Sequence, residues 1–177
     1  RLITEGIPVI TINSDISVPG KLCFVGQDLR QSGVVAAELM AKIAPGRGRV
    51  IAVTGNLEFQ AHRDRVAGFR QGISAWAAEV VVDVREGFDA YDQTHDCVGA
   101  AIAEADAAGD AIVGLYMATG SIEAALEVVR GYEAVLPAAR SRVRVITNDA
   151  LPIVLEGLAR GEIDFSILQD PRHQGSV

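Results

Sequence analysis

Short apolar runs alternate with segments of helical periodicity along almost the whole chain, and this alternation constrains the fold more than any other feature. The runs are rich in β-branched residues and lie at 8–12, 21–26, 49–54, 79–84, 111–116, 142–147 and 164–168. Apolar residues recur at helical spacing in 30–44, 61–77, 92–106, 120–131 and 150–160. Strands that are apolar throughout are buried on both faces, as happens when helices cover both sides of a parallel sheet. The alternation therefore predicts an α/β fold with parallel sheets flanked by helices.

Two segments that contain proline with glycine or polar residues divide this series into lobes. The segment "APGRG" (44–48) ends a helix just before a new strand, and the last strand ends in the polar sequence "LQDP" (168–171). We therefore predict that residues 1–46 form part of a first lobe, that 47–168 form a second lobe, and that 169–177 cross back toward the first. A sheet of this kind has about five strands, and residues 1–46 provide two. The first lobe is therefore expected to be incomplete, with its other strands supplied by sequence outside this segment.

Composition excludes several classes of function. The 177 residues carry 23 acidic and 16 basic side chains, a net charge of −7, so they offer no extended basic face for nucleic acid. Cys23 and Cys97 make neither a disulfide framework nor a metal-binding spacing. No apolar run approaches the roughly 18 residues that a membrane span needs, and we expect no membrane contact.

No group of residues has the spacing that catalysis requires. The segment "TGNLEFQ" after the third strand lacks the glycine spacing and the lysine of a phosphate loop, and no G-x-S-x-G turn occurs. His95 and Cys97 lie two positions apart on a predicted helix, where side chains do not face each other. We therefore expect no catalytic residue, no bound metal ion and no cofactor.

Polar side chains follow nearly every predicted strand. Ligands of open α/β sheets bind beyond the carboxyl ends of the strands. Amides and carboxylates dominate there, which favours binding of a polyhydroxylated or otherwise polar small molecule over a reaction. The alternative is that these residues only cap the helices that follow. The residues are Asn13, Ser14, Asp15, Gln27, Asp28, Gly55, Asn56, Glu86, Asp89, Ala118, Thr119, Asn148, Asp149, Gln169 and Asp170.

The segment "AHRDRVAGFRQG" (61–72) places cations in the first turn of a predicted helix, where the helix dipole disfavours them. Helical side chains lean toward the amino end of the helix, so the guanidinium of Arg65 is predicted to reach over the edge of the cleft. The alternative is a surface arginine paired with Asp64 or with a residue four positions before or after it. We expect His62 and Arg63 to be solvated. The neighbouring apolar stripe is predicted to face the core and consists of Val66, Phe69, Ile73 and Trp76.

Four segments in order resemble a known family: "GIPVITINSD", "FVGQDLRQSGVVAAELMAK", "RDRVAGFRQGI" and "VITNDALPIVLEGLARGEIDFSILQDPRHQG". The chain resembles the effector-binding core of LacI/GalR-type transcription regulators over essentially all of its length, with sugar-binding periplasmic proteins as near relatives. The resemblance implies a type I periplasmic-binding-protein-like fold, with two Rossmann-like lobes and a ligand held between them.

The resemblance also implies roles for individual residues. Asn13 and Asp149 fall where the family binds ligand hydroxyls, and Arg65 falls on its ligand-binding arginine. Gln169 matches a polar cleft residue near the hinge. Tyr91 lies near the position of an aromatic residue that stacks on the sugar ring, with Phe88 as the rival assignment. With Ser14 and Thr119, the predicted ligand-binding set is Asn13, Ser14, Arg65, Phe88, Tyr91, Thr119, Asp149 and Gln169.

Two departures put an ordinary hexose or pentose ligand in doubt. Family members place an Asn-Asp pair after the strand that here reads "VGLY", but this chain has "MATGS", so Thr119 or Ser121 is expected to replace the missing amide. Asn148 stands where the family has an aromatic residue before the final aspartate.

The function implied by the resemblance is an effector-binding domain of a cytoplasmic transcription regulator. Its expected partners are a sugar-like small molecule, a second copy of the chain in a homodimer, and operator DNA, which a separate N-terminal helix-turn-helix head outside this sequence would contact. The alternative, from a different class, is a periplasmic sugar-binding protein of an ABC transporter.

Overall fold

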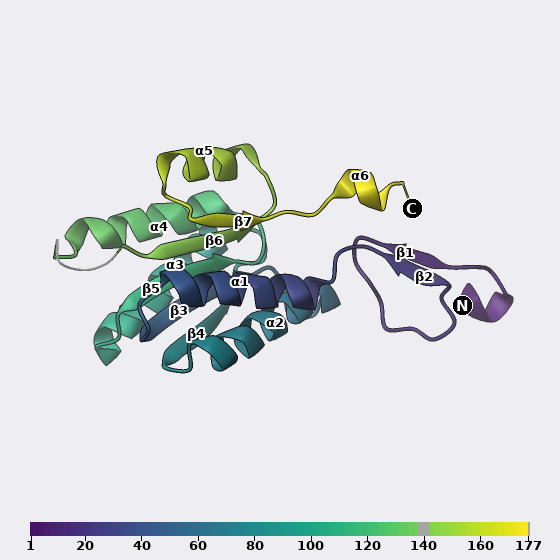
Figure 1. Ribbon diagram of the computed structural model, residues 1–177, viewed down its shortest axis with the longest axis horizontal. Coiled ribbons are helices and arrows are strands. Elements are labelled where there is room, and N and C mark those ends of the chain that lie inside the picture. The colour runs from purple at the N-terminus through teal and green to yellow at the C-terminus, as the bar shows by residue number, and fades with distance from the viewer. Residues whose placement is uncertain (138–141, 177) are drawn as a thin grey trace.

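The computed structural model describes residues 1–137 and 142–176, with only the backbone described at His173, and contains two separate parallel sheets (Figure 1). A small sheet pairs β1 (Ile10–Ile12) with β2 (Cys23–Val25) in parallel. A large sheet has the order β4-β3-β5-β6-β7, and all its neighbouring strands are parallel. The bounds of the large-sheet strands are β3 (Gly48–Thr54), β4 (Val80–Glu86), β5 (Ile112–Met117), β6 (Arg144–Asn148) and β7 (Phe165–Ile167). The predicted α/β fold with parallel sheets is confirmed.

Helices cover both faces of the large sheet, as the apolar strands predict. Helices α1 (Leu29–Ile43) and α2 (Gln60–Trp76) pack on one face, where Met40 and Phe69 meet Val50 and Tyr116. Helices α3 (Tyr91–Ala108), α4 (Ile122–Val135) and α5 (Pro152–Arg160) contribute to the core on the other face. A short turn, η1 (Ile3–Glu5), and the helix α6 (Pro171–Gln174) lie near the two ends of the chain. The helices on the two faces, seen in Figure 1, bury the central strands β3, β5 and β6, whereas the edge strands β4 and β7 stay partly exposed.

Local chemistry sets the ends of several helices. Asp28 is the N-cap of α1, and its carboxylate accepts a hydrogen bond from the backbone N–H of Gln31 at 2.9 Å. Gly109 and Gly161 end α3 and α5 in the left-handed conformation that glycine adopts without a steric penalty. The loops that flank these helices thus begin and end at defined residues.

Helices α1 and α2 approach each other so closely that two glycines are required. A Cβ atom on Gly33 would lie 2.0 Å from the backbone oxygen of Arg65, and one on Gly68 would lie 1.9 Å from that of Arg30. No side chain fits at such distances, so the backbones of the two helices are in direct contact. The backbone position of Arg65 is therefore set by α1 as well as by its own helix.

Two segments run from the large body to the side of the small sheet (Figure 1). The first runs from β2 to α1, and the second runs from β7 to α6 on the side of the small sheet. Because α1 packs on α2 and on the large sheet, this packing favours a lobe boundary between β2 and α1, before the predicted one at residue 46. The predicted division itself stays a prediction.

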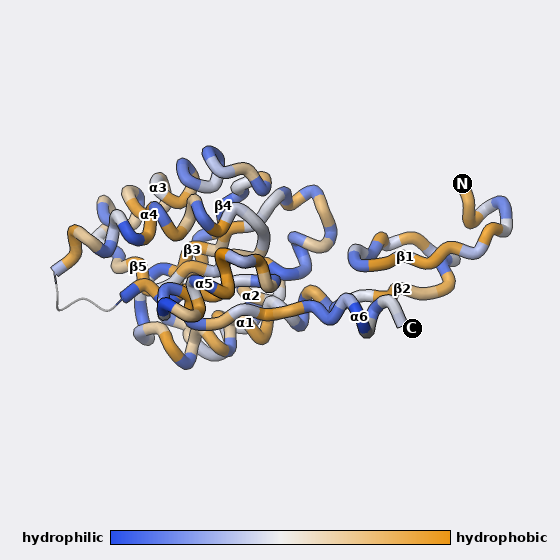
Figure 2. Tube along the Cα trace, turned by 90° about the horizontal axis from the view of Figure 1, so that it is seen from above, coloured by the Kyte–Doolittle hydropathy of each residue, from blue (hydrophilic) through white to orange (hydrophobic). Residues whose placement is uncertain are grey.

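The small sheet is apolar but has little cover within the described residues. Figure 2 shows β1 and β2 in hydrophobic colours, apart from the large body. Ile12 and Leu22 are 68% and 66% exposed. A two-stranded sheet with exposed apolar side chains buries too little surface for independent stability.

The predicted core stripe of α2 is correct at three of its four positions. Val66, Phe69 and Ile73 are buried, and Phe69 stacks on Tyr116 with ring centroids 4.4 Å apart. Trp76 is 49% exposed, so its predicted core position is wrong. It is the last residue of the helix, where the chain turns toward β4 and leaves the indole beside solvent.

Candidate functional site

The site lies where the strand order of the large sheet reverses. In sequence order the five strands read 2-1-3-4-5, and the reversal falls between β3 and β5, whose carboxyl ends form the crevice in which folds of this kind bind ligands. A cavity of about 410 Å³ opens there, between the large body and the small sheet. Its lining residues are Asn13, Ser14, Leu29, Phe59, Ala61, His62, Arg65, Asp89, Asp149 and Gln169. This volume suits a small molecule.

Arg65 is the buried cation of the cavity. Its residue is 7% exposed, and its Nη1 donates a hydrogen bond to the backbone oxygen of Ala118 at 2.8 Å, at the end of β5. Its buried Nε has no hydrogen-bond partner among the described residues. Buried polar atoms are almost always paired, so an unpaired polar atom in a residue that lines the cavity makes Arg65 a candidate for ligand binding. The alternative of a surface arginine paired with Asp64 does not fit this burial.

Asp89 presents a carboxylate to the cavity from the loop after β4. One of its oxygens accepts hydrogen bonds from the hydroxyl of Thr119 and from the backbone N–H of Gly120, the latter at 3.0 Å. Phe88 and Asp89 have φ angles of 51° and 55°, so the loop makes a left-handed turn that directs this carboxylate across to β5. Thr119 therefore orients Asp89 and is absent from the cavity lining.

Asn13 and Asp149 enter the cavity from opposite sides in the same backbone conformation. Each residue directly follows a strand, and its N–H adds one more backbone hydrogen bond to the neighbouring strand. Each also has a left-handed backbone conformation, with φ angles of 65° for Asn13 and 70° for Asp149. The N–H of Asn13 donates to Val25 at 2.9 Å, and the N–H of Asp149 donates to Ile167 at 3.0 Å. Left-handed non-glycine residues are uncommon and cost free energy. Both sheets therefore carry a strained polar residue at the same cavity.

Five of the eight predicted residues line the cavity. They are Asn13, Ser14, Arg65, Asp149 and Gln169. Besides Thr119, the structure leaves out the two predicted aromatics: Phe88 is 52% exposed, and Tyr91 points its hydroxyl to Glu127 while its ring stacks near His95. The hydroxyl contact with Glu127 raises the pKa of Tyr91 above its usual value.

Sequence reasoning missed His62 and Phe59 and undervalued Asp89. The Nδ1 atom of His62 accepts a hydrogen bond from the backbone N–H of Asn56 at 2.8 Å. In the neutral ring the proton therefore resides on Nε2, which makes that atom a donor. Phe59 lies edge-on to His62, with ring centroids 5.9 Å apart. The polar residues that follow the strands could have indicated Asp89, but no rule of sequence spacing indicates Phe59.

Gly55 allows His62 and Asp89 to approach the end of β3. A Cβ atom there would lie 2.3 Å from Cε1 of His62 and 2.7 Å from Oδ2 of Asp89. The missing side chain therefore leaves space in which an imidazole donor and a carboxylate acceptor come close together. The pair resembles the mixed donor and acceptor sets that bind hydroxyl groups.

Asn148, which replaces the aromatic residue of the family, is buried behind the cavity. Its Nδ2 donates to the hydroxyl of Tyr116 at 3.2 Å and to the backbone oxygen of Met117 at 3.1 Å, while its Oδ1 accepts from Ser32 at 3.4 Å. Burial raises the pKa of Tyr116. Asn148 thus links α1 to the ends of β5 and β6 and does not line the cavity.

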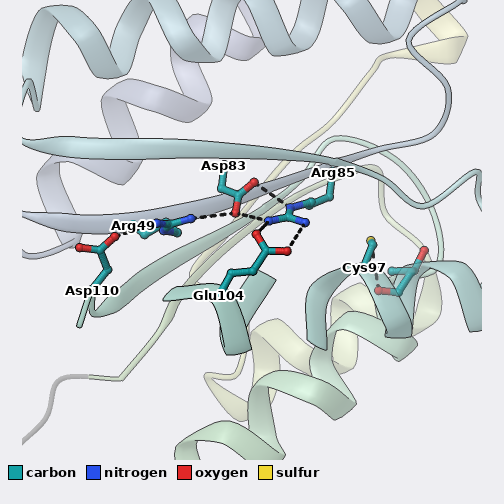
Figure 3. Close-up of polar contacts among 7 residues, drawn as sticks. Arg49, Asp83, Arg85, Cys97, Glu104 and Asp110 are labelled. Atoms are coloured by element: carbon teal, nitrogen blue, oxygen red, sulfur yellow. Dashed lines mark hydrogen bonds and ion pairs between the residues drawn. The ribbon is translucent and has the colours of Figure 1, made fainter. Parts of the chain in front are cut away.

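A charged network on the α3 side of the sheet does not contribute to the cavity lining (Figure 3). Asp83 on β4 binds Arg49 of β3 at 3.2 Å and Arg85 of its own strand at 2.7 Å. Arg85 also pairs with Glu104 of α3, and Arg49 pairs with Asp110 at 2.7 Å. Every charge in this network has a partner of opposite sign, which is typical of a structural role.

Within residues 1–137 and 142–176, no group of three or more His, Cys, Asp or Glu side chains is placed to hold a metal ion. Over the same residues, no helix is both long and apolar enough to cross a membrane.

The architecture defines the class of protein: two parallel sheets with a polar cavity between them at a topological switch point are typical of a fold that binds small molecules in a cleft. More specifically, the chain belongs to the periplasmic binding protein domain family, whose model matches residues 1–177.

Three relatives with similar sequence or structure are named or solved as binding proteins. A Rhizobium meliloti protein named for rhizopine binding is 26% identical over 180 residues, covering 96% of this chain and 55% of its own length. An ABC-transporter solute-binding protein of Burkholderia graminis, solved in complex with D-arabinose, is 26% identical with a TM-score of 0.79, covering 98% of this chain and 58% of that chain. The Caulobacter myo-inositol binding protein is 24% identical with a TM-score of 0.80, covering 98% and 57%, and supports the fold alone. The chain thus spans little more than half the length of these relatives.

Proposed function

We propose that this chain is the cleft-forming part of a solute-binding protein for a sugar or cyclic polyol. The observation that carries the proposal is the buried Arg65, whose Nε has no partner beside a cavity that both sheets line. Carboxylates, amides and a histidine donor surround it, as recognition of several hydroxyl groups requires. The D-arabinose complex of one relative and the name of another support a polyhydroxylated ligand.

The mechanism follows from the two origins of the cavity lining. Asn13 and Ser14 belong to the small-sheet side, whereas Arg65, Asp89 and Asp149 belong to the large body. A ligand that binds both groups stabilises the arrangement in which they face each other. It therefore shifts the population toward a closed cleft by the difference in its affinity for the open and closed arrangements.

The regulator interpretation drawn from the sequence has weaker support than the solute-binding alternative. The matched family is that of periplasmic binding proteins, and the relatives above are named or solved as binding proteins. Operator DNA, the homodimer and the cytoplasmic location belong to the regulator interpretation and stay predictions.

The test is a ligand screen on the full-length protein. Thermal melts with cyclitols, pentoses and hexoses identify binders, because a ligand at 100 times its Kd raises stability by about 2.7 kcal/mol. Isothermal titration calorimetry then gives the affinity. The proposal predicts at least one binder whose affinity falls in Arg65→Ala. It fails if no compound of these three classes shifts the melting temperature.

A further inference from the structure

We propose that Glu86 is a positioning residue for ligand binding: it holds the loop between β3 and α2 (55–59) in the conformation that directs His62 into the cavity. This inference rests on the proposed function and adds a residue that acts on the site without contacting the ligand. Glu86 is the last residue of β4, is partly buried and is absent from the cavity lining. His62 lines the cavity, where Nε2 of the neutral ring is a donor.

The loop stays attached to β4 beyond the ends of the two paired strands. The backbone N–H groups of Gly87 and Phe88 continue the pairing with the chain that leaves β3, through hydrogen bonds of 2.8 and 3.0 Å. The side chain of Glu86 then adds a bond, because its Oε1 accepts from the backbone N–H of Leu57 at 2.7 Å. Hydrogen bonds to a carboxylate are about twice as strong as neutral ones. Glu86 therefore attaches the middle of the loop to the sheet.

Arg63 holds Leu57 from the side of the helix. Its Nη1 donates to the backbone oxygen of Leu57 at 2.7 Å and to that of Glu58 at 2.6 Å. These bonds account for a cation in the first turn of α2, where the helix dipole disfavours positive charge. Leu57 is thus fixed by a carboxylate from β4 and by a guanidinium from α2, and the loop has little freedom to move.

The fixed loop in turn orients His62. The backbone N–H of Asn56, the residue before Leu57, donates to Nδ1 of His62 at 2.8 Å. The hydrogen bond to one ring nitrogen sets the orientation of the imidazole and therefore the direction of the other nitrogen. If Leu57 is released, the N–H of Asn56 moves with it, and the Nε2 donor loses its fixed direction. The effect of Glu86 on binding therefore passes through the loop and the imidazole ring.

Three variants of Glu86 distinguish hydrogen bonding from charge. Glu86→Ala should weaken ligand binding by about tenfold, which corresponds to roughly one hydrogen bond. Glu86→Gln keeps an oxygen at the same reach without the charge, so it should bind within about threefold of the wild type. Glu86→Asp keeps the charge but is too short to reach Leu57, so it should resemble Glu86→Ala. Glu58→Ala removes an exposed carboxylate from the same loop and is the matched control, with unchanged binding.

Isothermal titration calorimetry on the full-length protein measures these affinities. The probe is the tightest binder from a panel of cyclitols, pentoses and hexoses that includes myo-inositol, D-arabinose and D-glucose. If Glu86→Asp binds like the wild type while Glu86→Gln binds like Glu86→Ala, the effect is one of charge and the positioning role is overturned.

A double variant tests the route of the effect. His62→Ala should itself weaken binding. Adding Glu86→Ala to it should change the affinity by less than about twofold, because residues that act through one contact are not additive. A full additional loss in the double variant would show that Glu86 acts on the site by another route and would overturn the inference.

Amide hydrogen exchange tests the loop without any ligand. The amides of Asn56 and Leu57 should be protected in the wild type, should exchange faster in Glu86→Ala and should regain protection in Glu86→Gln. Amides of β5 are the internal reference, because they change only if the whole protein is destabilised. An Asn56 amide that is equally protected in Glu86→Ala and the wild type would overturn the link to His62 and leave the proposed function standing. If no compound of the panel binds the wild type, the proposed function fails, and the role of Glu86 in binding fails with it.

Discussion

Arg65 combines deep burial with an N–H group that has no partner in the described part of the chain, and this combination gives the sharpest prediction for a single residue. Arg65→Ala should weaken ligand binding by about 1.5–3 kcal/mol, because charged hydrogen bonds contribute that much. Arg65→Lys should restore little of it, since an ammonium lacks the planar fork of a guanidinium. Calorimetry on full-length protein measures both. Arg70→Ala, on the exposed side of the same helix, is the control and should bind normally. Unchanged affinity in Arg65→Ala would contradict a ligand role.

Two variants of Asp149 distinguish its effect on stability from its effect on ligand binding. Its φ angle of 70° favours glycine, so Asp149→Gly should unfold at a higher temperature than Asp149→Ala, with a difference of about 1 kcal/mol. Both variants lose the carboxylate, and both should bind ligand more weakly than the wild type. Thermal melts without ligand and titrations with ligand measure the two effects separately. Equal stability of the two variants would argue against backbone strain at this position.

Single residues also show how far sequence reasoning reaches. Asn13, Arg65 and Asp149 were predictable because each follows a strand end or matches a family position. Phe88 does not line the cavity, whereas the next residue, Asp89, does, and both residues have left-handed φ angles. Apolar periodicity reports the faces of strands and helices but carries no information about the handedness of a loop.

Among the elements, the contact between α1 and α2 is the one that sequence periodicity misreads. The larger apolar residues of 30–44, such as Val35 and Leu39, suggest the core-facing side, yet Ala36, Ala37 and Met40 are the fully buried ones. Small residues face α2 because the two backbones touch, and close approach leaves no space for branched side chains. Strand and helix positions were predictable from local pattern, but the distance between two helices depends on both partners.

Glycine substitutions test this contact. Gly33→Ala should destabilise the protein by about 1–3 kcal/mol, because its Cβ would lie 2.0 Å from the backbone oxygen of Arg65. Gly99→Ala is the matched control: it lies within α3 with no atom near its Cβ position, so it should stabilise by about 0.5–1 kcal/mol. Denaturant unfolding measures both. A neutral Gly33→Ala would show that the helices can separate without cost.

The ion-pair network around Asp83 of β4 predicts that the free energy of unfolding depends on pH in the acidic range. Partial burial raises the pKa of Asp83, but the guanidinium groups of Arg85 and Arg49 outweigh this effect and hold the pKa below its usual 3.8. Because the pKa in the folded state is depressed, the stabilisation is complete above about pH 4 and is lost as the pH falls through the folded value.

Asp83→Asn should therefore lower the free energy of unfolding by roughly 1–3 kcal/mol near neutral pH. Its melting curve should converge with that of the wild type as the pH falls toward about 2. Melts across this range measure the difference. Asp96→Asn, whose side chain is 86% exposed, should match the wild type throughout. A constant difference at every pH would assign the effect of Asp83 to packing instead of charge.

At the scale of the whole molecule, binding is expected to change shape as well as stability. Small-angle scattering of the full-length protein should show a smaller radius of gyration with saturating ligand, because the ligand contacts both sides of the cleft. Arg65→Ala at the same ligand concentration should keep the unliganded value. A binder that leaves the radius of gyration of the wild type unchanged would mean that the cleft is already closed.

The two connecting segments lie beside each other, since Nε2 of Gln27 donates to the backbone oxygen of Leu168 at 3.5 Å. A single connecting segment would permit the two sides of the cleft to rotate relative to each other about every axis. Two adjacent segments define a hinge axis. They permit rotation about that axis and resist rotation about the others. Each time the cleft closes, Asn13 should therefore return to the same place opposite Asp149. Closure around a ligand then requires motion along a single coordinate.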